Sequence, residues 1–177
     1  MHIDDKDGNL ATFCNVGGLC REDQEILSKI GPQILPHISA LTDDFYAVLQ
    51  DDPQTAQYIE GRVEQLKKTH IAWMNELFSG NYGPEFIQRQ ERIGDVHVRV
   101  RVPPIFVAAS MSFLRAAFPT IVAKNVHDHD LAGKAVGSLL RLLDLCQYLI
   151  DRKYNDTLMG NLGISPALLT RLQTIAK

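Results

Sequence analysis

The chain has 177 residues, of which 45% are apolar and 22% are charged, and its formal net charge is −3. These values are typical of one soluble globular domain, and the weak charge gives no indication of a nucleic-acid partner. We expect no membrane span, because no run of about 18 apolar residues occurs, and the acidic start lacks the apolar region of a signal peptide. Three cysteines without a CxxC spacing favour a reduced, cytoplasmic protein.

The apolar residues between the prolines recur with a helical period, which predicts an all-α protein of seven or eight helices. Residues 1–20 are expected to form a loosely held arm or a short helix. The first full helix is predicted to end at Gly31-Pro32, and a segment rich in glycine follows residue 79. The helices predicted for this half cover 21–30, 33–51, 53–59 and 60–79.

Three longer helices are predicted in the second half, over 84–102, 104–125 and 131–158. A bend is expected at Pro119. The polar residues 127–130, His-Asp-His-Asp, are expected to cap the last of these helices rather than to bind a metal. The tail 159–177 is interpreted as a linker toward a missing output domain, with a new helix beginning at Ser165-Pro166.

The two longest helices are candidates for a subunit interface. In 131–158 the apolar residues extend around more than one side of the helix, and 104–125 offers alanines for close approach. Two such helices from each subunit would form a four-helix dimer interface. Burial within a single chain is the alternative interpretation.

His97 differs from the other histidines in its surroundings. It shares a helix face with Ile93 and Val100, and Gly94 lies one turn before it. The missing side chain at Gly94 would clear space for a flat, bulky ligand, although a buried structural histidine remains the alternative. His70 lies on the apolar stripe of 60–79, where a core histidine is expected.

Three segments, taken in order and spacing, point to a family. They are Phe45-Tyr46, LKKTHIAWMNELFSGNYG at 66–83 and RIGDVHVRVRVPP at 92–104. Together they resemble the haem-binding domain of globin-coupled sensors, which include aerotaxis transducers and globin-coupled diguanylate cyclases. The resemblance implies a globin-like fold over 21–158, haem b as cofactor and dimerisation through the last two long helices.

The resemblance also implies roles for individual residues. His97, with Arg99 two residues later, matches the proximal iron ligand. Tyr46 matches a distal tyrosine whose hydroxyl donates to bound dioxygen, Leu66 matches a distal apolar residue that excludes water, and Thr69 is a second hydroxyl donor. The other expected haem contacts are Phe45, Ile93, Gly94, Val100 and Phe106.

Two positions leave alternatives open. Arg101 stands where the family often has glycine, and its side chain could point at a haem propionate or at solvent. A distal histidine would make the iron six-coordinate. His70 is the rival candidate for this role, although it is turned by about 100° around the helix from Thr69.

The resemblance implies a haem-based sensor of dioxygen or another diatomic gas that controls a fused C-terminal output. A diguanylate cyclase is the first expectation for that output, followed by a methyl-accepting or kinase module. The chain has no paired carboxylates, nucleophile–base set or phosphate loop, so we expect no enzyme activity in this domain. Two alternatives are a globin-fold signalling module without haem and a haem dioxygenase-type enzyme.

Overall fold

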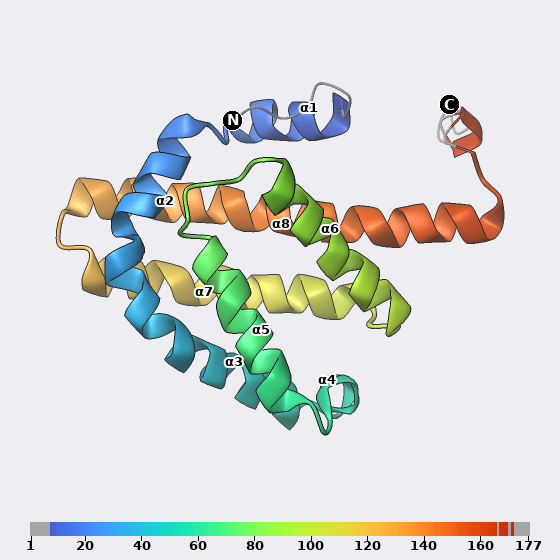
Figure 1. Cartoon of the computed structure of the whole chain (residues 1–177), viewed down its shortest axis with the longest axis horizontal. Helices are drawn as coiled ribbons and strands as arrows, with labels where there is room; N and C mark the ends of the chain where they lie inside the picture. Colours follow the sequence, from blue (N-terminus) through green and yellow to red (C-terminus); the bar gives the residue numbers. More distant parts are fainter. Residues whose placement is uncertain (1–7, 166, 170, 172–177) are drawn as a thin grey trace.

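The computed structural model describes residues 8–165, 167–169 and 171, which form α-helices joined by short connections (Figure 1). No strand occurs in this part of the chain, so the predicted all-α class is confirmed. The helices are α1 Gly8–Gly17, α2 Arg21–Ile34, the 3-10 helix η1 Leu35–His37, α3 Ile38–Asp51, α4 Pro53–Ile59, α5 Val63–Glu76, α6 Pro84–Arg99, α7 Pro104–Asn125 and α8 His129–Leu162.

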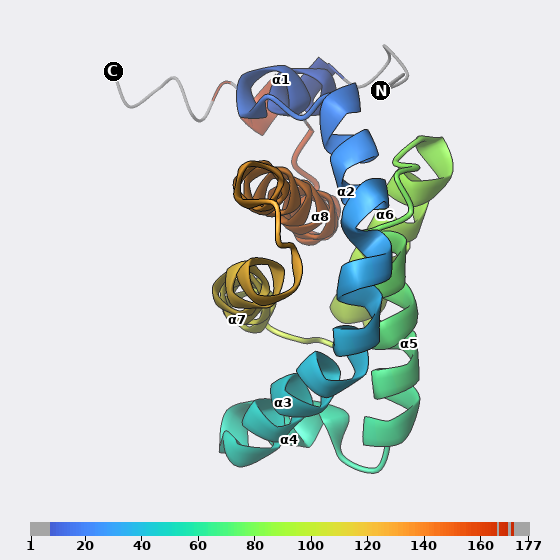
Figure 2. The same ribbon diagram turned by 90° about the vertical axis from the view of Figure 1, so that its left-hand side faces the viewer.

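The N-terminal segment is a short helix, which is one of its two predicted forms. α1 buries Leu10 and Cys14 in the main core. Its Phe13 stacks on Tyr148 of α8, with ring centroids 4.8 Å apart. α1 therefore covers part of α8 (Figure 2), and residues 1–7 of the predicted arm lie outside the described residues.

The second helix does not end at Gly31-Pro32, as the sequence predicts, but continues to Ile34. A Cβ atom on Gly31 would lie 3.3 Å from the Cβ of Phe78, so the absence of a side chain allows a close contact with the end of the α5 segment. Proline removes one N–H group but its φ angle suits a helix, and here tertiary packing outweighs that loss. Pro36 then lies in η1, which separates α2 from α3 where one helix over 33–51 is predicted.

Most other boundaries follow local signals. The Asp52 carboxylate accepts hydrogen bonds from the N–H groups at the start of α4, and Asp128 accepts one of 3.0 Å from Leu131 at the start of α8. Asp128 thus performs the capping role predicted for 127–130, whereas His129 and Asp130 already belong to the first turn of α8. α7 has its predicted bounds. α8 runs from His129 to Leu162, beyond the predicted 131–158 at both ends, and α6 ends at Arg99 rather than at residue 102.

α8 is the central helix of the molecule. It packs against α1, α2, α6 and α7, and its residues Leu139, Leu142 and Leu143 are buried within this one chain. Packing inside the chain therefore accounts for much of the apolar pattern around α8. α7 and α8 lie side by side and form one side of the molecule (Figure 2).

The apolar helix α7 is covered on only one face. Five residues at helical spacing point into the core, while the outer face exposes Ile105, Ala108, Ala109, Ser112, Ala116 and Ala123. Within the described residues, α7 is the one helix long and apolar enough to span a membrane, a test that core helices of soluble proteins also pass. This face therefore forms an uncovered strip of mainly small and apolar residues.

Candidate functional site

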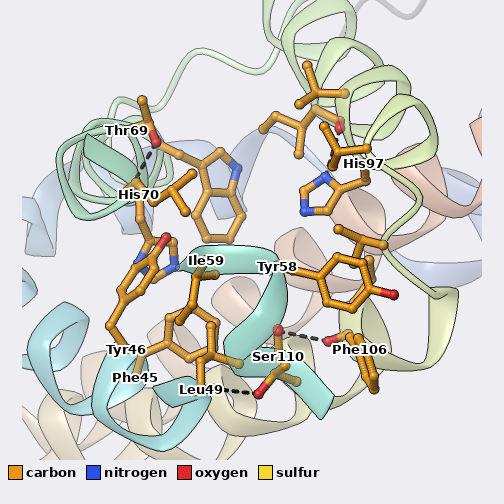
Figure 3. A pocket seen from close by; sticks show the side chains of 18 of the residues that line it. Phe45, Tyr46, Leu49, Tyr58, Ile59, Thr69, His70, His97, Phe106 and Ser110 are labelled. Atoms are coloured by element: carbon orange, nitrogen blue, oxygen red, sulfur yellow. Dashed lines mark hydrogen bonds between the residues drawn. The ribbon is translucent and has the colours of Figure 1, made fainter. Parts of the chain in front are cut away.

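A cavity of about 290 Å³ lies between α3, α4, α5, α6 and α7 (Figure 3). Its walls are chiefly apolar and aromatic, which is typical of a cofactor pocket. All the site residues that the sequence suggests, with the exception of Gly94, line this cavity: Phe45, Tyr46, Leu66, Thr69, Ile93, His97, Val100 and Phe106.

Gly94 serves a different purpose from the predicted one. A Cβ atom at this position would lie 2.9 Å from the carbonyl oxygen of Ile150 and 2.8 Å from the Lys153 side chain. The missing side chain therefore makes room for α8, which crosses α6 here, and not for a ligand in the cavity. The interpretation of Gly94 as a cofactor contact is corrected accordingly.

The ring of His97 is fixed by its own helix. Its Nδ1 lies 2.8 Å from the backbone oxygen of Ile93. A carbonyl oxygen only accepts, so Nδ1 carries the proton and Nε2 keeps its lone pair. Metal-binding histidines commonly donate the second N–H to a carbonyl in this way, which orients the ring and makes it a stronger ligand.

The turn after His97 is held by two backbone hydrogen bonds. The N–H of Val102 donates to the carbonyl of His97, and the N–H of Arg101 donates to Val98, each over 3.0 Å. This pattern ends helices with a left-handed residue, which is usually glycine. Arg101 has a φ angle of 60° and occupies that glycine position, so the departure from the family pattern falls where an L side chain is strained.

Apolar side chains beside His97 are left uncovered. Val96 precedes His97 in α6, and Val100 directly follows the end of that helix. The two valines are 39% and 38% exposed and line the cavity. Exposed valines that border a pocket are covered when a flat apolar group enters it, and their burial stabilises the complex. The proximal wall therefore suits haem, with a free imidazole nitrogen surrounded by apolar surface.

The opposite wall is provided by α3 and α5. Tyr46 is 6% exposed, and no described residue makes a hydrogen bond with its hydroxyl. Burial raises the pKa of the Tyr46 phenol to about 12, so the hydroxyl remains a donor at neutral pH. Phe45 holds the tyrosine from the side, with ring centroids 5.3 Å apart.

Leu66 and Thr69 differ in burial and in hydrogen bonding, although the sequence suggests that both face the ligand. Leu66 is partly buried and packs on the small apolar cluster of Phe45, Tyr46 and Ile59. Thr69 is exposed, and its hydroxyl donates a 2.8 Å hydrogen bond to the carbonyl of Leu66 within the same helix. Leu66 can therefore exclude water as it stands, whereas the Thr69 hydroxyl would have to leave its backbone partner to reach a ligand.

Three residues of the cavity carry no sequence signal strong enough to identify them. Tyr58 of α4 packs edge-on against Phe106, and Arg62, at the start of α5, places a cation at the pocket. Trp73 lies one turn after His70 and donates to Gln90 of α6 over 2.8 Å, which ties the two walls together. The apolar stripe of 60–79 contains Trp73, but nothing in the residue types around 58–62 indicates a pocket.

Comparison with known proteins agrees with this geometry. The family model described as Protoglobin matches residues 6–159. The globin domain of the Geobacter sulfurreducens globin-coupled sensor has a TM-score of 0.76 at 26% identity, and the match covers 81% of this chain and 96% of that chain. The globin domain of E. coli DosC in its ferric form I has a TM-score of 0.71 at 19% identity, with 80% and 99% covered.

The ferrous form II of the DosC domain gives a TM-score of 0.67 at 18% identity, with 72% of this chain and 89% of that chain covered. At these identities the two DosC structures show a shared fold. The family match extends over most of the chain, and it includes His97 and the elements that build the cavity. The chain therefore belongs to the protoglobin family, and it is a haem domain of the globin-coupled sensor type.

Proposed function

We propose that this domain senses dioxygen or another diatomic gas through haem b held by His97, in a cytoplasmic homodimer that controls a fused output domain. The observation that supports it best is the His97 imidazole, whose Nδ1 is fixed on Ile93 while Nε2 is left for the cavity. A diguanylate cyclase is our first choice for the output. The domain itself is proposed to have no catalytic activity.

The residues that line the cavity have different proposed roles. Haem, when bound, supplies the iron that takes a diatomic ligand. His97 orients the group from α6, and Tyr46 offers its protonated hydroxyl as a donor to a ligand with partial negative charge. Leu66 and the neighbouring Ile59 exclude water from the same space, which favours slow oxidation of the iron.

The dimer is supported by the uncovered strip of α7. Its exposed alanines allow a second helix to approach closely, and an apolar strip of this kind is typical of a surface that another chain covers. α8 lies beside α7 at the same edge of the molecule (Figure 2). The two helices of two subunits would then form the proposed four-helix interface.

Transmission to the output is supported by the contact between α6 and α8. Lys153 pairs with Asp95 over 3.2 Å, and Arg152 pairs with Glu91. Together with the close approach at Gly94, these pairs bind the helix that carries His97 to the helix that leads toward residues 159–177. A displacement of α6 on gas binding would reach α8 directly.

The test is haem titration of the purified apoprotein, followed by absorption spectroscopy of the ferrous protein under dioxygen and carbon monoxide. We expect one haem for each chain in the wild type and no retained haem in His97→Ala. His37→Ala, a histidine in η1 away from the cavity, is the control and retains it. A protein that gives no Soret band would instead be the non-haem module, and rapid turnover of nitric oxide with dioxygen would identify the dioxygenase.

A further inference from the structure

Aromatic rings on the wall opposite His97 form a continuous stack. The ring of His70 lies between those of Phe45 and Trp73, with centroid distances of 4.8 and 5.6 Å and interplanar angles of 30° and 19°. The Tyr46 ring meets His70 edge-on at 5.8 Å, and Figure 3 shows the two residues across the cavity from His97. The orientation of the Tyr46 phenol therefore depends on a stack whose last ring is that of Trp73.

A residue of the opposite helix fixes the end of this stack. The Nε1–H group of Trp73 donates a hydrogen bond of 2.8 Å to Oε1 of Gln90. Gln90 belongs to α6, seven residues before His97. Seven residues are nearly two helical turns, so the two side chains extend from the same face of α6. The helix that carries the proximal histidine thus also holds the last ring of the opposite wall.

Packing alone does not account for an amide at position 90. Gln90 is fully buried. Because an indole N–H group can only donate, the amide must present its oxygen to Trp73. Its Nε2 is then left buried, with no hydrogen-bond partner among the described residues. An unpaired buried donor lowers stability, and a methionine would fill a similar volume without one, so the amide is explained by its oxygen and by the orientation that this oxygen gives to Trp73.

The link between the two helices is otherwise exposed to water. In the part of the chain that the structure describes, two side-chain hydrogen bonds connect α5 to α6, one between Trp73 and Gln90 and one of 2.9 Å from Arg89 to Glu76. The second is an ion pair whose side chains are 43% and 34% exposed, and pairs of this kind contribute little. The buried hydrogen bond is therefore the contact that can hold the two walls in a fixed relative position.

We propose that Gln90 is a positioning residue for the gas ligand. Through Trp73 and the ring stack, it holds the Tyr46 hydroxyl where this group donates to bound dioxygen. The proposal rests on the proposed function, because it assumes that haem occupies the cavity and that Tyr46 is the donor. A displacement of α6 then changes the position of the donor as well as the contact with α8.

The decisive measurement is the rate of dioxygen dissociation from the ferrous, haem-loaded protein by stopped flow. We expect Gln90→Met, which removes the acceptor at similar volume, to speed dissociation about threefold or more. Trp73→Phe, which keeps a stacked ring and removes the donor, should have a similar effect. Gln90→Glu keeps an acceptor oxygen and should restore a rate close to that of the wild type. Glu76→Gln is the matched control, since it breaks the exposed link between the same two helices and should leave the rate unchanged.

A double variant separates positioning from a general loosening of the fold. In Tyr46→Phe the hydroxyl that Gln90 positions is absent, so the addition of Gln90→Met should cause no further increase in the dissociation rate. Ultraviolet resonance Raman spectra of the haem-loaded protein provide a direct signature, because Trp73 is the only tryptophan of the chain. The band that reports hydrogen bonding at the indole N–H should shift in Gln90→Met and not in Glu76→Gln. Haem content is measured in every variant.

Several results would overturn the inference. An indole band that does not shift in Gln90→Met, or a wild-type dissociation rate in that variant, would overturn it while gas binding at His97 stands. Equal acceleration by Gln90→Met with and without the Tyr46 hydroxyl would also overturn it, because the effect would then not pass through the donor. A wild type that binds no haem would overturn this inference and the proposed function together.

Discussion

The hydroxyl of Tyr154 donates a hydrogen bond of 2.8 Å to the backbone carbonyl of Val102. The N–H of Val102 in turn donates to the carbonyl of His97. Two successive hydrogen bonds thus connect a side chain of α8 to the backbone of the proximal histidine. Burial, with a contribution from the charge of Asp151, raises the pKa of Tyr154 to about 12, which keeps it a donor.

Replacement of Tyr154 by phenylalanine removes the first of these hydrogen bonds. We expect Tyr154→Phe to lower the free energy of unfolding by about 1 kcal/mol, because a partly buried carbonyl loses its partner. Urea denaturation of the apoprotein measures this. Tyr148→Phe is the matched control on the same helix, since that ring stacks on Phe13 and its hydroxyl has no partner in the described chain; equal losses in both variants would contradict the assignment.

The crossing of α6 and α8 depends on Gly94. We expect Gly94→Ala to destabilise the fold by about 1–3 kcal/mol, because the new methyl group overlaps backbone and side-chain atoms of α8. Gly160→Ala, in open space near the end of α8, should instead be neutral or stabilise by up to about 1 kcal/mol. Thermal unfolding compares the two. A Gly94→Ala protein as stable as the wild type would show that the helices can separate freely.

The Tyr46 hydroxyl is predicted to retain dioxygen. Tyr46→Phe should speed dioxygen dissociation about tenfold or more, because a hydrogen bond to a partly charged acceptor contributes about 1.5–3 kcal/mol. Carbon monoxide dissociation should change less, since it is a poorer acceptor. Tyr58→Phe, on another wall of the same cavity, is the control, and an unchanged dissociation rate in Tyr46→Phe would remove Tyr46 from the mechanism.

The same tyrosine makes a prediction about pH. Because its pKa is raised to about 12, Tyr46 should remain protonated beyond the usual tyrosine pKa of about 10. Stopped-flow dissociation rates should therefore stay constant through that range. A step in the rate near the usual pKa would show that the phenol is more exposed to water than the structure indicates.

A buried carboxylate ties α2 to α8. Burial alone would raise the pKa of Asp23, but hydrogen bonds from Arg141, Ser138 and the Cys20 N–H outweigh it, so the net pKa lies below the usual value. A lowered pKa in the folded state stabilises the protein above the unfolded pKa of about 3.9, and this contribution is lost as the pH falls through the folded pKa.

Asp23→Asn should therefore cost about 2 kcal/mol at neutral pH, because the paired Arg141 loses its charge partner. The cost should shrink in acid, where the wild type loses the same contribution. Chemical denaturation at several pH values measures it. Glu25→Gln, in an exposed pair with Arg21, is the control and should change little.

The sequence predicts the elements of this fold better than their ends. The helical period and the prolines locate every long helix, and the resemblance assigns residues that do meet at the cavity, from Tyr46 to His97. Prediction from the sequence fails where packing against a segment distant in the chain determines the local structure. The helix α2 continues through Gly31, which packs closely against Phe78. Gly94 faces α8 rather than the cavity. The position of His70 follows the same rule, because its partners come from helices α3 and α5, and only their packing shows that its Nδ1 is left unpaired.

The C-terminal end of α8 projects away from the other helices of the described chain (Figure 1). The stretch from Lys153 to Leu162 is about 13 Å long, since each helical residue advances about 1.5 Å. If α8 pivots where Gly94 touches Ile150, about 18 Å from Leu162, a tilt of about 10° would carry Leu162 sideways by about 3 Å. The end of α8 would then act as a lever, in which a displacement too small to repack the core is magnified at the point where the chain leaves the domain.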